Sequence, residues 1–220
     1  MLLPVWTLKT AENDGIKGAR RDFTYYVLAL SWSPSYCADE GRGRGEPQCS
    51  GARPYAFVLH GLWPQNDTDQ PAFCAGGGKG FVPEAVLRAM LDIMPARSLV
   101  IHQYRKHGTC SGLSAEAYFG IARRLYEAIT IPARYIAPRD YQTLTPRQIE
   151  ADFVAANEGI ESGAVTVACG RGRRLREVRI CFSRDLKPTA CGRTGDRARR
   201  CRLARVILPP VRGGGARRAR

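Results

Sequence analysis

Eight cysteines are spread over the 220-residue chain, and they limit the folds that it can adopt. Their even number and wide spacing predict four disulfide bonds, which persist in an oxidising compartment. No two of them form a C-x-x-C pair, so a zinc ribbon or a thioredoxin-type redox site is disfavoured. Eight free thiols in the cytosol are the alternative. The cysteines are Cys37, Cys49, Cys74, Cys110, Cys169, Cys181, Cys191 and Cys201.

The hydrophobic pattern predicts strands, then helices, then strands, which is typical of an α+β domain. Aromatic and β-branched runs predict strands at 23–32, 55–63, 164–169, 175–183 and 205–208. Apolar residues at helical spacing, preceded by capping residues, predict helices at 83–94, 102–108, from Ser114 to Ile129 and from Thr145 to about 157–159.

The chain ends differ from its centre in composition. We expect a flexible leader at 1–21, a single domain at 22–209 and a basic disordered tail at 210–220. The start, MLLPVWTL, is interrupted by Pro4 and is too short for the apolar core of a signal peptide, so we interpret it as a mature, trimmed or misannotated N-terminus. No stretch approaches the roughly 20 apolar residues of a membrane span.

The formal net charge is +14, from 34 lysines and arginines against 20 acidic residues, and 29 of the 34 are arginines. Arginine binds phosphate through two parallel hydrogen bonds, so this surplus favours a polyanionic partner. An arginine-rich composition that reflects a GC-rich genome is the alternative.

All three histidines lie in two short segments: FVLHGLWPQ carries His60, and IHQYRKHGTC carries His102 and His107. Two histidines brought together from distant segments are the minimal equipment for acid–base catalysis near neutral pH. Lys106 adds a cation beside them, which suits a substrate that contains phosphate. A disulfide between Cys74 and Cys110 would hold the two segments together.

An α-helix over 102–107 places four side chains in one sector, at about 100° per residue. Relative to His102, Lys106 lies near 40°, Gln103 near 100° and His107 near 140°. A metal site is the competing interpretation, but zinc-binding helical pairs use an i,i+4 spacing, and the lysine would repel a cation. Ser-His-Asp chemistry is disfavoured because no G-x-S-x-G motif occurs.

The segments FVLHGLWPQ and HQYRKHGTC closely resemble the two catalytic segments of the ribonuclease T2 family. YYVLALSWSPSYC resembles the first core strand of that family, and the likeness extends from Phe23 to Cys201. SWSPSYC and CSGLSAEAYF are most similar to bacterial, periplasmic ribonuclease I-type members. The resemblance implies an α+β fold, with a curved antiparallel sheet flanked by helices and stapled by disulfides, and a periplasmic or secreted location.

The same resemblance implies a metal-independent endoribonuclease, with no cofactor, that cleaves single-stranded RNA. The ribose 2′-hydroxyl attacks the phosphorus, giving a 2′,3′-cyclic phosphate and then a 3′-phosphate. His107 would be the base, His60 the acid, Lys106 the stabiliser of the phosphorane, and His102 a phosphate ligand, while Trp63 would stack on a base. We expect a monomer with RNA as its substrate, no obligate protein partner and no membrane association.

One position departs from the family, which usually has glutamate where this chain has Gln103. Glutamine donates and accepts hydrogen bonds but does not titrate, so we expect activity to persist with an optimum nearer neutrality. Eight cysteines allow 105 pairings; we predict Cys37–Cys49, Cys74–Cys110, Cys169–Cys201 and Cys181–Cys191. The alternatives to a nuclease are a cationic RNA-binding or toxic protein with an inactive site, and a metallohydrolase. Base preference and biological role are not encoded in these features.

Overall fold

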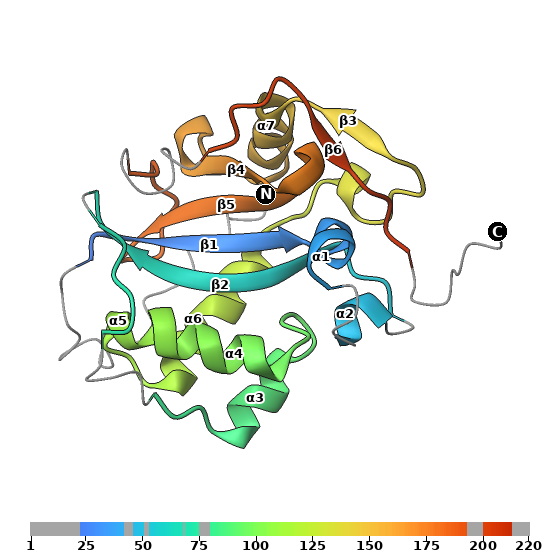
Figure 1. The fold of residues 1–220 in the computed structure, drawn as a ribbon. Coiled ribbons are helices and arrows are strands. Elements are labelled where there is room, and N and C mark those ends of the chain that lie inside the picture. The colour runs from blue at the N-terminus through green and yellow to red at the C-terminus, as the bar shows by residue number, and fades with distance from the viewer. Residues whose placement is uncertain are drawn as a thin grey trace, which may run out of the picture.

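The computed structural model describes residues 23–41, 46–50, 53–67, 69–74, 80–192 and 200–212. A four-stranded antiparallel sheet with the strand order β2-β1-β5-β4 forms its centre (Figure 1). Its strands are β1 (Tyr25–Trp32), β2 (Phe57–Gln65), β4 (Val165–Cys169) and β5 (Leu175–Ser183). β3 (Gln142–Leu144) and β6 (Val206–Leu208) form a separate pair. The predicted leader at 1–21 and residues 213–220 of the predicted tail lie outside the described residues.

Helices flank the sheet at both edges: α3 to α6 lie on the side of β2, and α7 lies beside β4 (Figure 1). The helices are α1 (Ser33–Asp39), α2 (Pro47–Ser50), α3 (Glu84–Met90), α4 (Arg97–Gln103), the π-helical η3 (Tyr104–Gly108), α5 (Thr109–Ser111), α6 (Ala115–Ala128) and α7 (Pro146–Ala156). Short 3₁₀ turns are η4 (Ala133–Tyr135), η5 (Ser162–Ala164) and η6 (Arg171–Arg173). This arrangement confirms the predicted α+β class with an antiparallel sheet and flanking helices.

Local sequence signals account for several helix ends. Ser114 accepts a hydrogen bond from the amide of Ala117 at the start of α6, and Thr145 and Gln148 form the predicted capping box of α7. Pro34 lies in the first turn of α1, where its missing N–H leaves no bond unmade.

The two faces of the sheet differ in what covers them. Alternate residues of β1, including Leu28 and Leu30, pack into the main core with the fully buried Tyr118 of α6. On the opposite face, Val27 and Ala29 belong to a smaller buried cluster with Trp63. The functional side chains described below lie on this second face.

A β-bulge in β2 interrupts the alternation of side chains at His60. Ala29 of β1 lies opposite Gly61 and Leu30 lies opposite Leu59, which leaves His60 as the extra residue. Consequently Leu59 and Leu62, although three positions apart, both pack into the main core. Bulges of this kind re-aim a side chain beside many active sites.

All four predicted disulfides are confirmed: Cys37–Cys49, Cys74–Cys110, Cys169–Cys201 and Cys181–Cys191. The first joins α1 to α2. The second joins the segment that follows β2 to α5, and so connects the two histidine-bearing segments as the sequence predicts.

Candidate active site

His60 lines a cavity of about 530 Å³ on the second face of the sheet. The bulge leaves its side chain 26% exposed, and His102 from α4 lines the same cavity. Cationic and acidic side chains share the lining, which includes Arg171, Arg176, Glu40 and Glu46. A volume of this size accommodates a small-molecule or nucleotide-sized group.

The second histidine segment contains a π-helical turn where the sequence predicted a regular α-helix. α4 ends at Gln103, and in η3 the amide of Thr109 bonds to the carbonyl of Tyr104, five residues back. Gly108 allows this turn, because a Cβ there would lie 2.3 Å from a ring carbon of Tyr104. The predicted α-helical angle of His107 is therefore wrong, since π turns widen the helix, often at functional sites.

His107 is only 8% exposed and packs against Trp63, with ring centroids 5.4 Å apart. Burial, and then the charges of Lys106, His60 and His102, lower the pKa of His107 from 6.5 to about 3. Among the described residues its Nδ1 has no hydrogen-bond partner. A histidine in this environment is neutral over most of the pH range, which is the state that accepts a proton.

Gln103 is 2% exposed and lies directly over β2. Its Oε1 accepts a hydrogen bond of 2.8 Å from Trp63 Nε1, which fixes the orientation of the amide. A Cβ on Gly61 would lie 2.1 Å from the same Oε1, so the close approach requires glycine.

Trp63 lies between the two histidines that the sequence pairs as acid and base. Its ring is 5.3 Å from that of His60 and 5.4 Å from that of His107, and the Arg179 guanidinium lies 5.1 Å from its centroid. The side chain is 9% exposed. Because stacking on a base needs an open ring face, this burial counts against the predicted stacking role, which stays a prediction.

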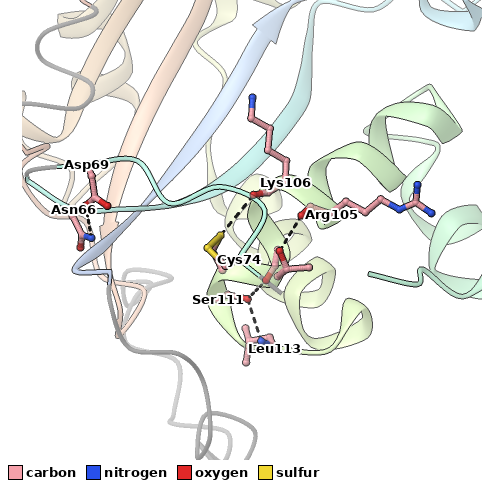
Figure 2. Close-up of a disulfide and its surroundings, with 10 residues drawn as sticks. Asn66, Asp69, Cys74, Arg105, Lys106, Ser111 and Leu113 are labelled. Atoms are coloured by element: carbon pink, nitrogen blue, oxygen red, sulfur yellow. Dashed lines mark hydrogen bonds between the residues drawn. A yellow bond between two sulfur atoms is a disulfide. The ribbon is translucent and has the colours of Figure 1, made fainter. Parts of the chain in front are cut away.

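His102 and Lys106 lie at the more open part of the site. His102 is exposed as a whole residue. The burial of part of its ring, and then the charges of Lys106 and His60, lower the pKa of His102. Lys106 is half-buried, and its side chain leaves η3 in a different direction from that of Arg105 (Figure 2). The backbone of Lys106 is held in place, because its carbonyl accepts a hydrogen bond of 2.8 Å from the amide of Phe73.

Two charged residues of β5 join the site although the sequence analysis did not select them. Glu177 is 1% exposed, and its Oε1 lies 2.7 Å from His60 Nδ1. Burial opposes ionisation of this carboxyl, but His60 and Arg179 outweigh it and hold the pKa of Glu177 well below its usual range. The signal in the sequence is the run LREVRICFS, in which Glu177 and Arg179 interrupt a strand that is otherwise buried.

The candidate site therefore gathers His60, Gln103, His107 and Trp63 in direct or near contact, with His102 and Lys106 beside them. In the part of the chain that the structure describes, no three histidine, cysteine, aspartate or glutamate side chains are grouped to hold a metal ion. Nor does any helix of the described residues have the length and apolar character needed to cross a membrane.

Histidines and cations beside an open cavity are the groups that acid–base catalysis on an anionic substrate requires. The model of the ribonuclease T2 family matches residues 23–191. The chain therefore belongs to the ribonuclease T2 family, and it is an endoribonuclease.

Individual relatives agree with this assignment. A ribonuclease of Aeromonas hydrophila is 33% identical over 189 residues, covering 84% of this chain and 82% of the relative. Ribonuclease I of Escherichia coli (strain K12) is 27% identical over 205 residues, covering 74% of this chain and 76% of the relative. The solved structure of RNase NT in complex with 5′-AMP matches with a TM-score of 0.65 at 22% identity, over 86% of this chain and all of that one.

Proposed function

We propose that this endoribonuclease cleaves single-stranded RNA by transphosphorylation, without a metal ion. His107 takes the proton of the ribose 2′-hydroxyl as the new bond from O2′ to phosphorus forms. His60 gives a proton to the 5′-oxygen as its bond to phosphorus breaks, which leaves a 2′,3′-cyclic phosphate. Hydrolysis of the cyclic phosphate then gives a 3′-phosphate end. DNA, which lacks the 2′-hydroxyl, is not a substrate.

The observation that carries this proposal is the contrast between the two histidines. His107 is buried and neutral, with cations beside it, whereas His60 faces a buried carboxylate. Two titratable groups with such different surroundings are suited to opposite roles in proton transfer. General acid–base catalysis of this kind contributes typically about 10²–10⁴-fold to the rate.

The remaining predicted residues are assigned to the phosphate. Lys106 and the Gln103 amide stabilise the charge that develops on the phosphorane, and His102 binds a phosphate of the substrate. The cavity beside His60 and His102 receives a nucleotide, in line with the 5′-AMP held by RNase NT. We further propose a monomer, without cofactor or protein partner, in the periplasm or outside the cell, which four disulfides favour.

The test is digestion of single-stranded RNA in EDTA by the wild type, His60→Ala and His107→Ala, with the products analysed for cyclic phosphate. The expected result is cyclic phosphate from the wild type and a loss of about 10²–10⁴-fold in each variant. Lys187→Ala, an exposed cation outside the site, is the matched control. Binding of RNA without cleavage would support an inactive RNA-binding protein, and loss of activity in EDTA would support a metallohydrolase.

A further inference from the structure

Glu177 reaches His60 across the central strand of the sheet. It lies on β5 while His60 lies on β2, and β1 runs between them. The β1 residues at this level are small: Ser31 lies opposite Glu177, and Ala29 lies opposite both Arg179 and Gly61. Side chains of the two outer strands can therefore meet above β1.

The two oxygens of the Glu177 carboxylate have different partners. Oε2 accepts a hydrogen bond from Arg179 Nε at 2.9 Å and forms a salt bridge with Arg179 Nη2 at 2.7 Å. Oε1 lies 2.7 Å from His60 Nδ1. An ionised carboxylate only accepts hydrogen bonds, so Nδ1 of His60 carries a proton. Arg179 thus holds Oε2, while Oε1 faces the histidine and has Arg176 Nε at the longer distance of 3.7 Å.

We infer that Glu177 is a positioning residue for His60, fixing its ring through Nδ1 and stabilising the imidazolium that protonates the leaving oxygen. This inference rests on the assignment of His60 as the acid. As the bond from phosphorus to O5′ breaks, the Nε2 proton passes to O5′ and His60 becomes neutral. Glu177 stays ionised throughout and takes no proton. The carboxylate of a Ser-His-Asp triad behaves in the same way.

A purely structural role is the alternative, in which Glu177 only balances the buried Arg179. The two roles differ in what they do to the protonation of His60. Other charged and titratable groups also surround this ring or its cavity. They are Arg176 and Arg179 of β5, Arg171 of η6, His102 of α4, Lys106 and His107 of η3, Asp39 of α1, and Glu40 and Glu46 of the segment after it. Among the described residues, only Glu177 forms a hydrogen bond with the side chain of His60.

The first experiment compares the pH dependence of kcat/KM for the wild type and Glu177→Gln on a dinucleotide substrate. Glutamine keeps the shape but removes the charge that stabilises the imidazolium. The alkaline limb should move toward acid by about one pH unit or more, and kcat at neutral pH should fall by about 10- to 100-fold. Glu161→Gln removes an exposed carboxylate and is the matched control, with an unchanged profile. A uniform loss of kcat/KM at every pH, with the alkaline limb at its wild-type position, would overturn the inference.

A second substrate isolates the proton donor. This substrate is a ribonucleoside 3′-phosphodiester with a p-nitrophenyl leaving group. The leaving group departs as a stable phenolate, so it needs little protonation. The loss in Glu177→Gln should shrink at least several-fold on this substrate, and Glu177→Gln should add no further loss in the His60→Ala background. An equal loss on both substrates, or an additive loss in the double variant, counts against the positioning role.

A third measurement uses the wild type, so it does not require the Glu177→Gln variant to fold. Only three histidines are present, so ¹⁵N-histidine labelling gives a spectrum that is simple to assign. Neutral His60 should carry its proton on Nδ1, and a bare Nδ1 with the proton on Nε2 refutes the inference. Failure of the proposed function is distinguishable, because in that case His60→Ala itself retains activity or no cyclic phosphate forms.

Discussion

Replacing Gly61 by alanine tests how closely the site amide is fitted to the strand beneath it. A Cβ at this position would lie 2.1 Å from Gln103 Oε1, 2.8 Å from Gln103 Cδ and 2.6 Å from Trp63 Nε1. Real Cβ contacts stay beyond 3.0 Å, so the amide oxygen must retreat by at least 0.9 Å, the difference between 3.0 and 2.1 Å. Both displaced groups are side-chain ends, so the fold can adjust while the site geometry changes.

The expected effects on stability and on activity therefore differ in size. Overpacking of this kind costs about 1–3 kcal/mol of the free energy of unfolding. Because we propose that the Gln103 amide contacts the reacting phosphate, its displacement by about 1 Å should lower kcat/KM by about 10²-fold. The hydrogen bond from Trp63 to Gln103, now 2.8 Å, is stretched or broken by the same movement.

The assay is kcat/KM on a dinucleotide, combined with urea unfolding. Gly120→Ala is the matched control, because its Cβ would meet nothing within 4 Å on the exposed side of α6. This control should keep its activity and gain about 0.4–1 kcal/mol of stability. In a Gln103→Ala background, the loss caused by Gly61→Ala should be several-fold smaller. Wild-type kcat/KM in Gly61→Ala, or an equal loss in both backgrounds, would refute the reasoning.

Three further predictions concern the base, a disulfide and the core. A pKa lowered to about 3 keeps His107 unprotonated as the pH falls, so the acid limb of kcat/KM should lie far below 6.5; a limb at pH 6–7 would contradict this. Replacing Cys74 and Cys110 by serine opens a 36-residue loop and should lower the free energy of unfolding by about 4 kcal/mol. An unchanged midpoint of urea unfolding would contradict this. Tyr118→Phe removes the 2.6 Å hydrogen bond to the Leu62 carbonyl and should cost about 1–3 kcal/mol, and a loss below 0.5 kcal/mol would show that the carbonyl finds another donor.

Much of the fold could be predicted because its signals are local. The apolar runs at 23–32 and 175–183 gave strands close to β1 and β5, and the capping box at Thr145 marks the start of α7. The four disulfide pairs agree with the pairing that we proposed beside the family resemblance. The short β3 strand was missed because it is stabilised by pairing with β6, some 60 residues later in the chain, and not by its own sequence.

The histidines of the site could be predicted from their clustering in two motifs, but their electrostatics could not. The non-titrating Gln103 predicted an optimum nearer neutrality. The burial of His107 acts in the opposite direction, because it lowers the pKa of the base and extends activity into acid. Burial depends on packing between η3 and β2, which no local pattern contains. Glu177 was missed for a related reason, since its partner lies two strands away.

Both histidines that we propose for proton transfer lie at an irregularity of a regular element. His60 is the extra residue of a bulge in β2, and His107 lies in a π turn at the end of α4. The groups that support them, Glu177 and Trp63, lie at regularly paired positions of the ladders with β1. An inserted residue turns one side chain toward the site while the ladder on either side keeps its register, so the histidine is re-aimed and still held rigidly. Breaks in hydrophobic periodicity that coincide with a titratable residue therefore indicate this kind of site more directly than the residue types alone.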